Sequence, residues 1–131
     1  MKDLISPKLS VNTAILVLGL LALFHILILL GVLPNSFVWG AKTTDAAEIA
    51  KLETVALIMS LIFLSFFLIK KYLMNKGNSQ KTINIFMWIM FIWFTFNIIG
   101  NILSSSTIEK VIFIPVSIIL SLVSWRLALQ K

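Results

Sequence analysis

The segment VNTAILVLGLLALFHILILLGVL, residues 11–33, contains one histidine and no other ionisable side chain. As an α-helix rising about 1.5 Å per residue it would extend about 34 Å, enough to cross the roughly 30 Å hydrocarbon core of a bilayer. The segment is longer than the apolar core of a usual signal peptide, and no small-x-small cleavage site follows it. We therefore expect a retained membrane-spanning helix.

Three more apolar blocks follow, so that spans are expected at residues 11–33, 52–73, 82–104 and 110–129. Hydrophobic residues make up 60% of the chain and charged residues 12%, whereas soluble domains carry about 25% charged residues. A chain with so little charge lacks the polar surface of a water-soluble globule. The sequence therefore predicts an all-α polytopic membrane protein, a four-transmembrane-helix bundle formed by a single domain over residues 1–131.

Local signals indicate where the first helix ends and the second begins. Pro34 stops the first helix because proline lacks the backbone N–H of a helical residue, and residues 34–44 form a linker. Asp45 and Glu48 then have the spacing of a capping box. This spacing predicts that the second helix begins near Ala46, before its apolar part starts.

The later blocks carry polar residues to which we assign structural roles. Lys70 and Lys71 can extend the short second apolar stretch by snorkelling, with their charged ends in the head-group layer. Ser117, Ser121 and Ser124 lie on one face of the fourth block, and small residues on one face favour close packing between membrane helices.

The lysines and arginine are distributed unequally between the two sides of a four-span protein. The side with both termini and the second loop carries eight of them, and the other side carries three: Lys42, Lys51 and Lys110. Positive residues near span ends prefer the cytoplasm. We therefore expect a multi-pass membrane protein with both termini in the cytoplasm.

The composition also excludes several function classes. The chain has no cysteine, which rules out disulfide chemistry, thiolate catalysis and cysteine-ligated metals. The net charge of +6 could indicate nucleic-acid binding, but the basic residues gather at the ends of apolar blocks and do not form one helical stripe. We predict no nucleic-acid partner, no metal and no cofactor.

His25 is the ionisable residue deepest in a predicted helix, in the outer half of the bilayer. Ionisable groups inside a membrane are costly and usually face the bundle interior. The simplest interpretation is a neutral histidine bonded to one polar neighbour; a proton-handling or ligand-binding role is the alternative. One histidine without partners does not make a metal or haem site.

Asn97 and Asn101 are four residues apart in the third block, so they share a helix face with Trp93. Gly100 beside them allows a neighbouring helix to approach closely. Asparagines in membrane helices commonly form hydrogen bonds between helices, and a binding role is the other interpretation. Both asparagines fall in the outer half of the bilayer, at a depth similar to that of His25.

Glu53 and Trp39 complete the candidate site at the outer rim. Glu53 lies where the second helix enters the membrane, so it either stays hydrated or turns inward to pair with His25 or an asparagine. We therefore predict that His25 faces the interior with Glu53, Asn97 or Asn101 within reach. The candidate ligand-binding cluster is His25, Trp39, Glu53, Asn97 and Asn101; no catalytic residue is assigned.

Three short motifs carry a resemblance to a known group of proteins. They are the stretch 37–42, FVWGAK, the acidic residue Glu53, and the stretch 97–101, NIIGN. They resemble small bacterial four-span membrane proteins with a Val-Trp-Gly-Gly-basic segment after the first helix. Ala41 departs from the second glycine of that pattern. The resemblance implies the four-span topology and a location in the bacterial cytoplasmic (inner) membrane, and it carries no activity.

Three hypotheses for function remain open at this point. The first is a non-enzymatic protein that binds a membrane-protein partner or a lipid-like small ligand through the polar cluster, with a homo-oligomer left open. The second is an intramembrane enzyme that uses His25 as acid or base, with an asparagine polarising the substrate. The third is a small proton-coupled carrier in which His25 titrates.

Overall fold

A computed structural model describes residues 5–32, 46–103, 107 and 109–130 of the chain. It is 89% helical, with no strand in the described part. In chain order the helices are α1 (Pro7–Leu29), α2 (Ala46–Lys76), α3 (Lys81–Ile102), the π-helical turn η3 (Glu109–Phe113) and α4 (Ile114–Ala128). This structure confirms the predicted all-α four-helix bundle.

The first helix begins and ends earlier than its apolar block. The Leu9 N–H donates to Ser6 Oγ at 3.0 Å, and Pro7 occupies the first turn, so α1 begins in the polar segment before residue 11. At the other end Gly31 has φ 77°, and the Val32 N–H donates to the Leu27 carbonyl at 3.0 Å. This glycine cap ends α1 before Pro34 is reached.

The second helix begins at Ala46, as the spacing of Asp45 and Glu48 predicted; Asp45 itself lies outside the described residues. Its 31 residues correspond to about 46 Å, so both ends extend beyond the hydrocarbon core. A second glycine cap ends it: Gly77 has φ 68°, and the Asn78 N–H donates to the Leu73 carbonyl at 3.1 Å.

The fourth span begins with the π-helical turn Glu109–Phe113 and continues as α4. Pro115 lies in the first turn of α4 and has no N–H to donate to a preceding carbonyl, so the regular α-helical ladder cannot run through it. A wide turn before the proline adjusts the backbone at this position. It also brings Phe113 against Phe24 of α1, with ring centroids 5.2 Å apart.

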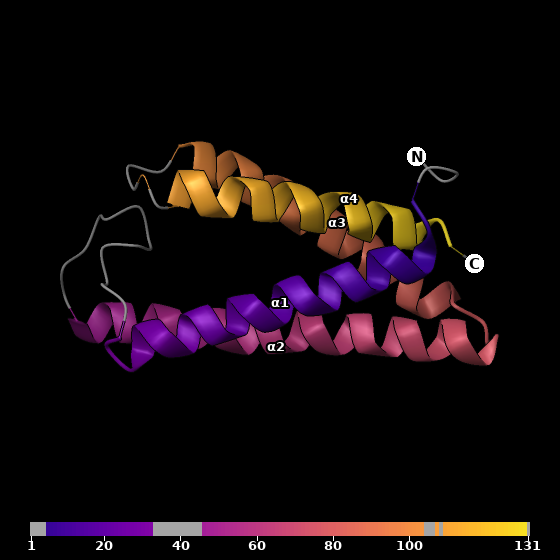
Figure 1. Cartoon of the computed structure of the whole chain (residues 1–131), viewed down its shortest axis with the longest axis horizontal. Helices are drawn as coiled ribbons and strands as arrows, with labels where there is room; N and C mark the ends of the chain where they lie inside the picture. The colour runs from indigo at the N-terminus through magenta and orange to yellow at the C-terminus, as the bar shows by residue number, and fades with distance from the viewer. Residues whose placement is uncertain (1–4, 33–45, 104–106, 108, 131) are drawn as a thin grey trace.

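The helices are arranged as two antiparallel pairs. α1 packs mainly on α2, α3 packs mainly on α4, and contacts between α1 and α4 join the two pairs. α2 and α3 contact each other much less. The pairs lie close together at the end where α1 begins and α4 ends, and they diverge toward the opposite end (Figure 1).

The main core fills the end at which the pairs meet. Aromatic and sulfur-containing side chains of α2 and α3 pack there against aliphatic side chains of α1 and α4, with central members Leu18, Phe67, Met87, Met90 and Leu120. Ser117, Ser121 and Ser124 are all buried, which confirms the predicted packing face on α4. The hydroxyls of Ser121 and Thr95 lie 3.0 Å apart and connect α4 to α3.

The outer faces of the helices are apolar and exposed. In the most apolar 18-residue stretch of each candidate span, 28%, 22%, 22% and 44% of the residues are buried, so most of these apolar side chains need a nonaqueous surrounding. All four helices are long and apolar enough to cross a bilayer. The chain is therefore a multi-pass membrane protein.

Candidate functional site

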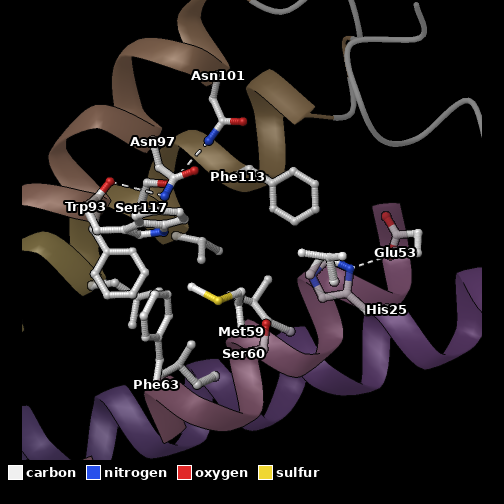
Figure 2. A pocket seen from close by; sticks show the side chains of 17 residues that line it. His25, Glu53, Met59, Ser60, Phe63, Trp93, Asn97, Asn101, Phe113 and Ser117 are labelled. Atoms are coloured by element: carbon white, nitrogen blue, oxygen red, sulfur yellow. Dashed lines mark hydrogen bonds and ion pairs between the residues drawn. The ribbon is translucent and has the colours of Figure 1, made fainter. Parts of the chain in front are cut away.

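A cavity of about 380 Å³ lies between the two helix pairs, on the side where they diverge. Its lining comes from α1, α2, α3, η3 and α4 (Figure 2). Most lining side chains are apolar, with Leu18, Phe63 and Leu120 near the main core. The polar lining residues are His25, Glu53, Ser60, Asn97, Asn101 and Ser117.

His25 of α1 and Glu53 of α2 form a polar pair on one wall. Nδ1 of His25 lies 2.5 Å from Oε2 of Glu53. The Glu53 side chain is fully buried and that of His25 is 14% exposed. This contact confirms that His25 is paired with one of its predicted neighbours, and it selects the inward orientation of Glu53 over the hydrated one.

Aromatic rings enclose this pair from one side. The Phe24 ring meets the His25 ring edge-on, at a centroid distance of 5.8 Å, and Phe24 in turn contacts Phe113. Whichever atom holds the proton, the bond to Glu53 occupies Nδ1 of His25. Nε2 of His25 has no hydrogen-bond partner among the described residues, and the ring lines the cavity. Nε2 is therefore available to a ligand.

Asn97 and Asn101 of α3 lie on the opposite wall, as Figure 2 shows. Nδ2 of Asn97 donates to the Trp93 carbonyl at 3.2 Å, and Nδ2 of Asn101 donates to Ser117 Oγ at 3.2 Å. The second bond connects α3 to α4, as expected for asparagine between membrane helices. Within the described part of the chain the two side-chain oxygens accept no hydrogen bond.

The structure thus brings His25, Glu53, Asn97 and Asn101 to one cavity but divides them between two walls. No hydrogen bond between described residues joins His25 to either asparagine. Trp39 lies outside the described residues. A set of three His, Cys, Asp or Glu side chains that could hold a metal is not found among the residues searched, which are the described ones.

The cavity reaches the surface of the bundle on α2 and α3. Two of its lining residues, Val55 on α2 and Trp93 on α3, are 54% and 47% exposed. These two helices contact each other much less than α1 contacts α2 or α3 contacts α4.

Sequence reasoning missed a second polar centre, at the opposite end of the bundle. Lys70 was expected to snorkel, but its side chain is fully buried. Its Nζ donates to Gln80 Oε1, to Asn84 Oδ1 at 2.5 Å and to the Gln130 carbonyl at 2.7 Å. The ammonium group thereby binds α2 to the start of α3 and the end of α4.

Arg126 of α4 has a related role and is also buried. Its Nε donates to the Ile5 carbonyl at 2.7 Å, which fixes the start of α1 to the end of α4. Lys70 lies three and seven residues after Phe67 and Phe63, which the structure buries on the same helix face. The sequence around them is apolar on every face, so it does not by itself distinguish Lys70 from Lys71.

Together the fold and the cavity define a multi-pass helical membrane protein with a largely apolar cavity that carries polar groups on two walls. Comparison of the chain with protein-family models, with curated protein sequences and with solved structures gives no significant match. The function is therefore argued from the residues of the two polar centres.

Proposed function

We propose that the protein binds a lipid-like small molecule in the cavity between its helix pairs. The observation that carries this proposal is a mostly apolar cavity of about 380 Å³ with polar groups on two facing walls and exposed lining residues on α2 and α3. Small-molecule sites commonly have volumes of about 300–1,000 Å³, mostly apolar linings and a few polar groups that fix orientation.

The available polar atoms indicate which head group would fit. The side-chain oxygens of Asn97 and Asn101 only accept hydrogen bonds, and each amide already donates to the protein. A head group with a donor, such as a hydroxyl, would satisfy them. Nε2 of His25 provides one further position on the facing wall, while the tail would lie against the apolar lining.

A photoreactive long-chain alcohol tests the proposal. In the purified protein we expect crosslinks at cavity residues, above all Met59 and Phe63, located by mass spectrometry of peptides. Replacing Ala56, which lines the cavity, with phenylalanine should reduce those crosslinks several-fold by filling the space. Ala50→Phe on the exposed face of the same helix is the matched control and should leave them unchanged.

A different distribution of crosslinks would contradict the proposal. If the native protein and Ala56→Phe were crosslinked equally, and only at outward-facing residues, the alcohol would be labelling the lipid-facing surface of the protein. The cavity would then not be a binding site for this class of molecule.

The contact between His25 and Glu53 favours a second candidate, an intramembrane enzyme. A ring nitrogen oriented by a carboxylate, with the other nitrogen open to a cavity, is the arrangement of a general base. Comparison of the native protein with His25→Phe separates the two candidates. An enzyme would convert the bound lipid in the native protein and not in His25→Phe, whereas a binding protein would leave the lipid unaltered in both. A proton-coupled carrier would instead need a water path to His25 from both sides.

The arrangement of the helices also supports a location and orientation. α1 begins, α4 ends and α2 connects to α3 at the same end of the bundle (Figure 1). Six of the eight basic residues counted for this side are described and belong to that end: Lys8, Lys70, Lys71, Lys76, Lys81 and Arg126. We propose that this end is cytoplasmic and that the protein resides in a bacterial cytoplasmic membrane, in agreement with the preference of positive residues for the cytoplasm.

Topology reporters check this orientation. A fusion within residues 77–79, between α2 and α3, should give a cytoplasmic signal. A fusion in residues 34–44 should give the signal of the opposite side. The expected contrast is essentially complete, because each reporter is active on one side of the membrane. A reversed pair of signals would overturn the orientation and leave the fold untouched.

A further inference from the structure

A second cavity, of about 470 Å³, lies at the end of the bundle where α3 begins and α4 ends. It is separate from the cavity that contains His25 and shares no lining residue with it. Its polar lining includes Gln80, Lys81 and Asn84, and its apolar lining includes Ile85, Trp88 and Ala128. Lys81 is exposed, so its ammonium group is free to meet a ligand at the mouth.

The wall of this second cavity is backed by buried positive charge. Gln80 and Asn84 both accept hydrogen bonds from Lys70 Nζ, so the Lys70 ammonium lies directly behind them. Among the described residues, Arg126, also buried, donates only to neutral acceptors, the Ile5 carbonyl and the Gln130 side-chain oxygen. In the described part of the chain, the only ion pair is the one between His25 and Glu53, in the other cavity.

Among the described residues neither buried cation has a carboxylate partner, so an anion in the second cavity would compensate positive charge beside it. Burying a positive charge is costly unless an opposite charge or good acceptors compensate, and neutral amide and carbonyl oxygens compensate only in part. Basic pockets between membrane helices on the cytoplasmic side bind the phosphates of anionic lipids. The second cavity offers Lys81 in its lining and Lys70 behind its neutral polar side chains Gln80 and Asn84.

The apolar lining indicates that the anion belongs to a lipid. Ile85 and Trp88 are 61% and 40% exposed and lie three residues apart on α3, so they form a continuous apolar face that leads away from Lys81. A phosphate beside Lys81 would leave its acyl chains along this face. Tryptophan is also enriched at the level of lipid head groups.

We propose that the second cavity binds the phosphate of an anionic phospholipid, with Lys81 in direct contact and Lys70 stabilising it from behind Gln80 and Asn84. The site is independent of the ligand proposed for the His25 cavity. The bound phospholipid would hold the junction of α2, α3 and α4 in the leaflet that contains anionic lipids.

Native mass spectrometry of protein released from nanodiscs tests this proposal. In discs of phosphatidylcholine with phosphatidylglycerol, we expect one retained phosphatidylglycerol per chain in preference to phosphatidylcholine. Lys81→Gln should weaken that retention about fivefold, the effect of one lysine near an anionic lipid surface. The matched control is Lys76→Gln, which removes the same charge from an exposed residue at the same end but outside the cavity lining; it should retain the lipid.

Two further arms decide the source of the phosphate. Inorganic phosphate added to phosphatidylcholine discs should not raise the melting temperature, since it lacks the acyl chains that the Ile85 and Trp88 face would hold. A rise that depends on Lys81 would assign the site to free phosphate and overturn the lipid proposal. Equal loss of phosphatidylglycerol in Lys81→Gln and Lys76→Gln would show only general surface charge and would also overturn it. Circular dichroism confirms that both variants remain folded.

Discussion

Lys70→Met is expected to lower the free energy of unfolding by about 3 kcal/mol, because a fully buried donor is removed from three acceptors on two other helices. The lysine ammonium carries three hydrogens, and the structure gives it three acceptors on α3 and at the end of α4. Methionine keeps a similar length but leaves Gln80 Oε1 and Asn84 Oδ1 without their donor.

The loss of unfolding free energy in Lys70→Met is moderate because methionine also removes the cost of burying a charged group, and this gain offsets part of the loss. Asn84 Nδ2 still donates to the Gln130 carbonyl at 2.9 Å, so that carbonyl keeps one partner.

Unfolding in mixed detergent micelles, followed by circular dichroism, measures this effect. Lys71→Met, the same change at the next, less buried residue, is the matched control and should shift stability by less than about 0.5 kcal/mol, as expected for a residue outside any buried network. Equal stability of the two variants would show that Lys70 does not hold the three helices together.

Ser121→Leu is expected to destabilise the bundle by about 1–3 kcal/mol, the cost of inserting extra methylene groups into a packed interior. Ser121 is 5% exposed, and its hydroxyl lies 3.0 Å from that of Thr95 on α3. Leucine would separate α3 from α4 and remove this contact. Because Asn101 also joins α3 to α4 through Ser117, the separation would disturb one wall of the His25 cavity.

Thermal unfolding in detergent measures the melting temperature of Ser121→Leu against that of a control variant. Ser65→Leu is the matched control, since Ser65 is exposed on α2 and its hydroxyl donates only to the carbonyl of its own helix at Leu61. We expect its melting temperature to stay near that of the native protein. A native-like melting temperature for Ser121→Leu would mean that the serine face of α4 tolerates a large side chain and is not a close-packed contact.

The two polar centres differ in the kind of contact that each makes. At the end where the helix pairs meet, Lys70 and Arg126 use their hydrogen bonds to connect helices. At the diverging end, the His25 and asparagine side chains keep polar atoms open to a cavity. The Lys70 and Arg126 centre therefore holds the helix pairs together. We propose that the His25 centre, where packing is incomplete, receives a ligand.

The sequence by itself determined the four apolar helices, the start of α2 at Ala46 and the serine packing face of α4. These features depend on local properties: the length of an apolar run, the spacing of a capping box and the recurrence of small residues on one helix face. The sequence also placed His25, Glu53, Asn97 and Asn101 at similar depth, because depth follows from position along a helix.

Only the tertiary structure decided how these residues meet. Whether His25 contacts Glu53 or an asparagine depends on the rotation of each helix about its axis and on the angle between the two helix pairs. Both follow from contacts between residues far apart in the chain, such as Phe24 with Phe113 and Arg126 with Ile5. The same contacts turned Lys70 inward, since burial with three acceptors replaced the snorkelled position that its place at the end of an apolar run had predicted.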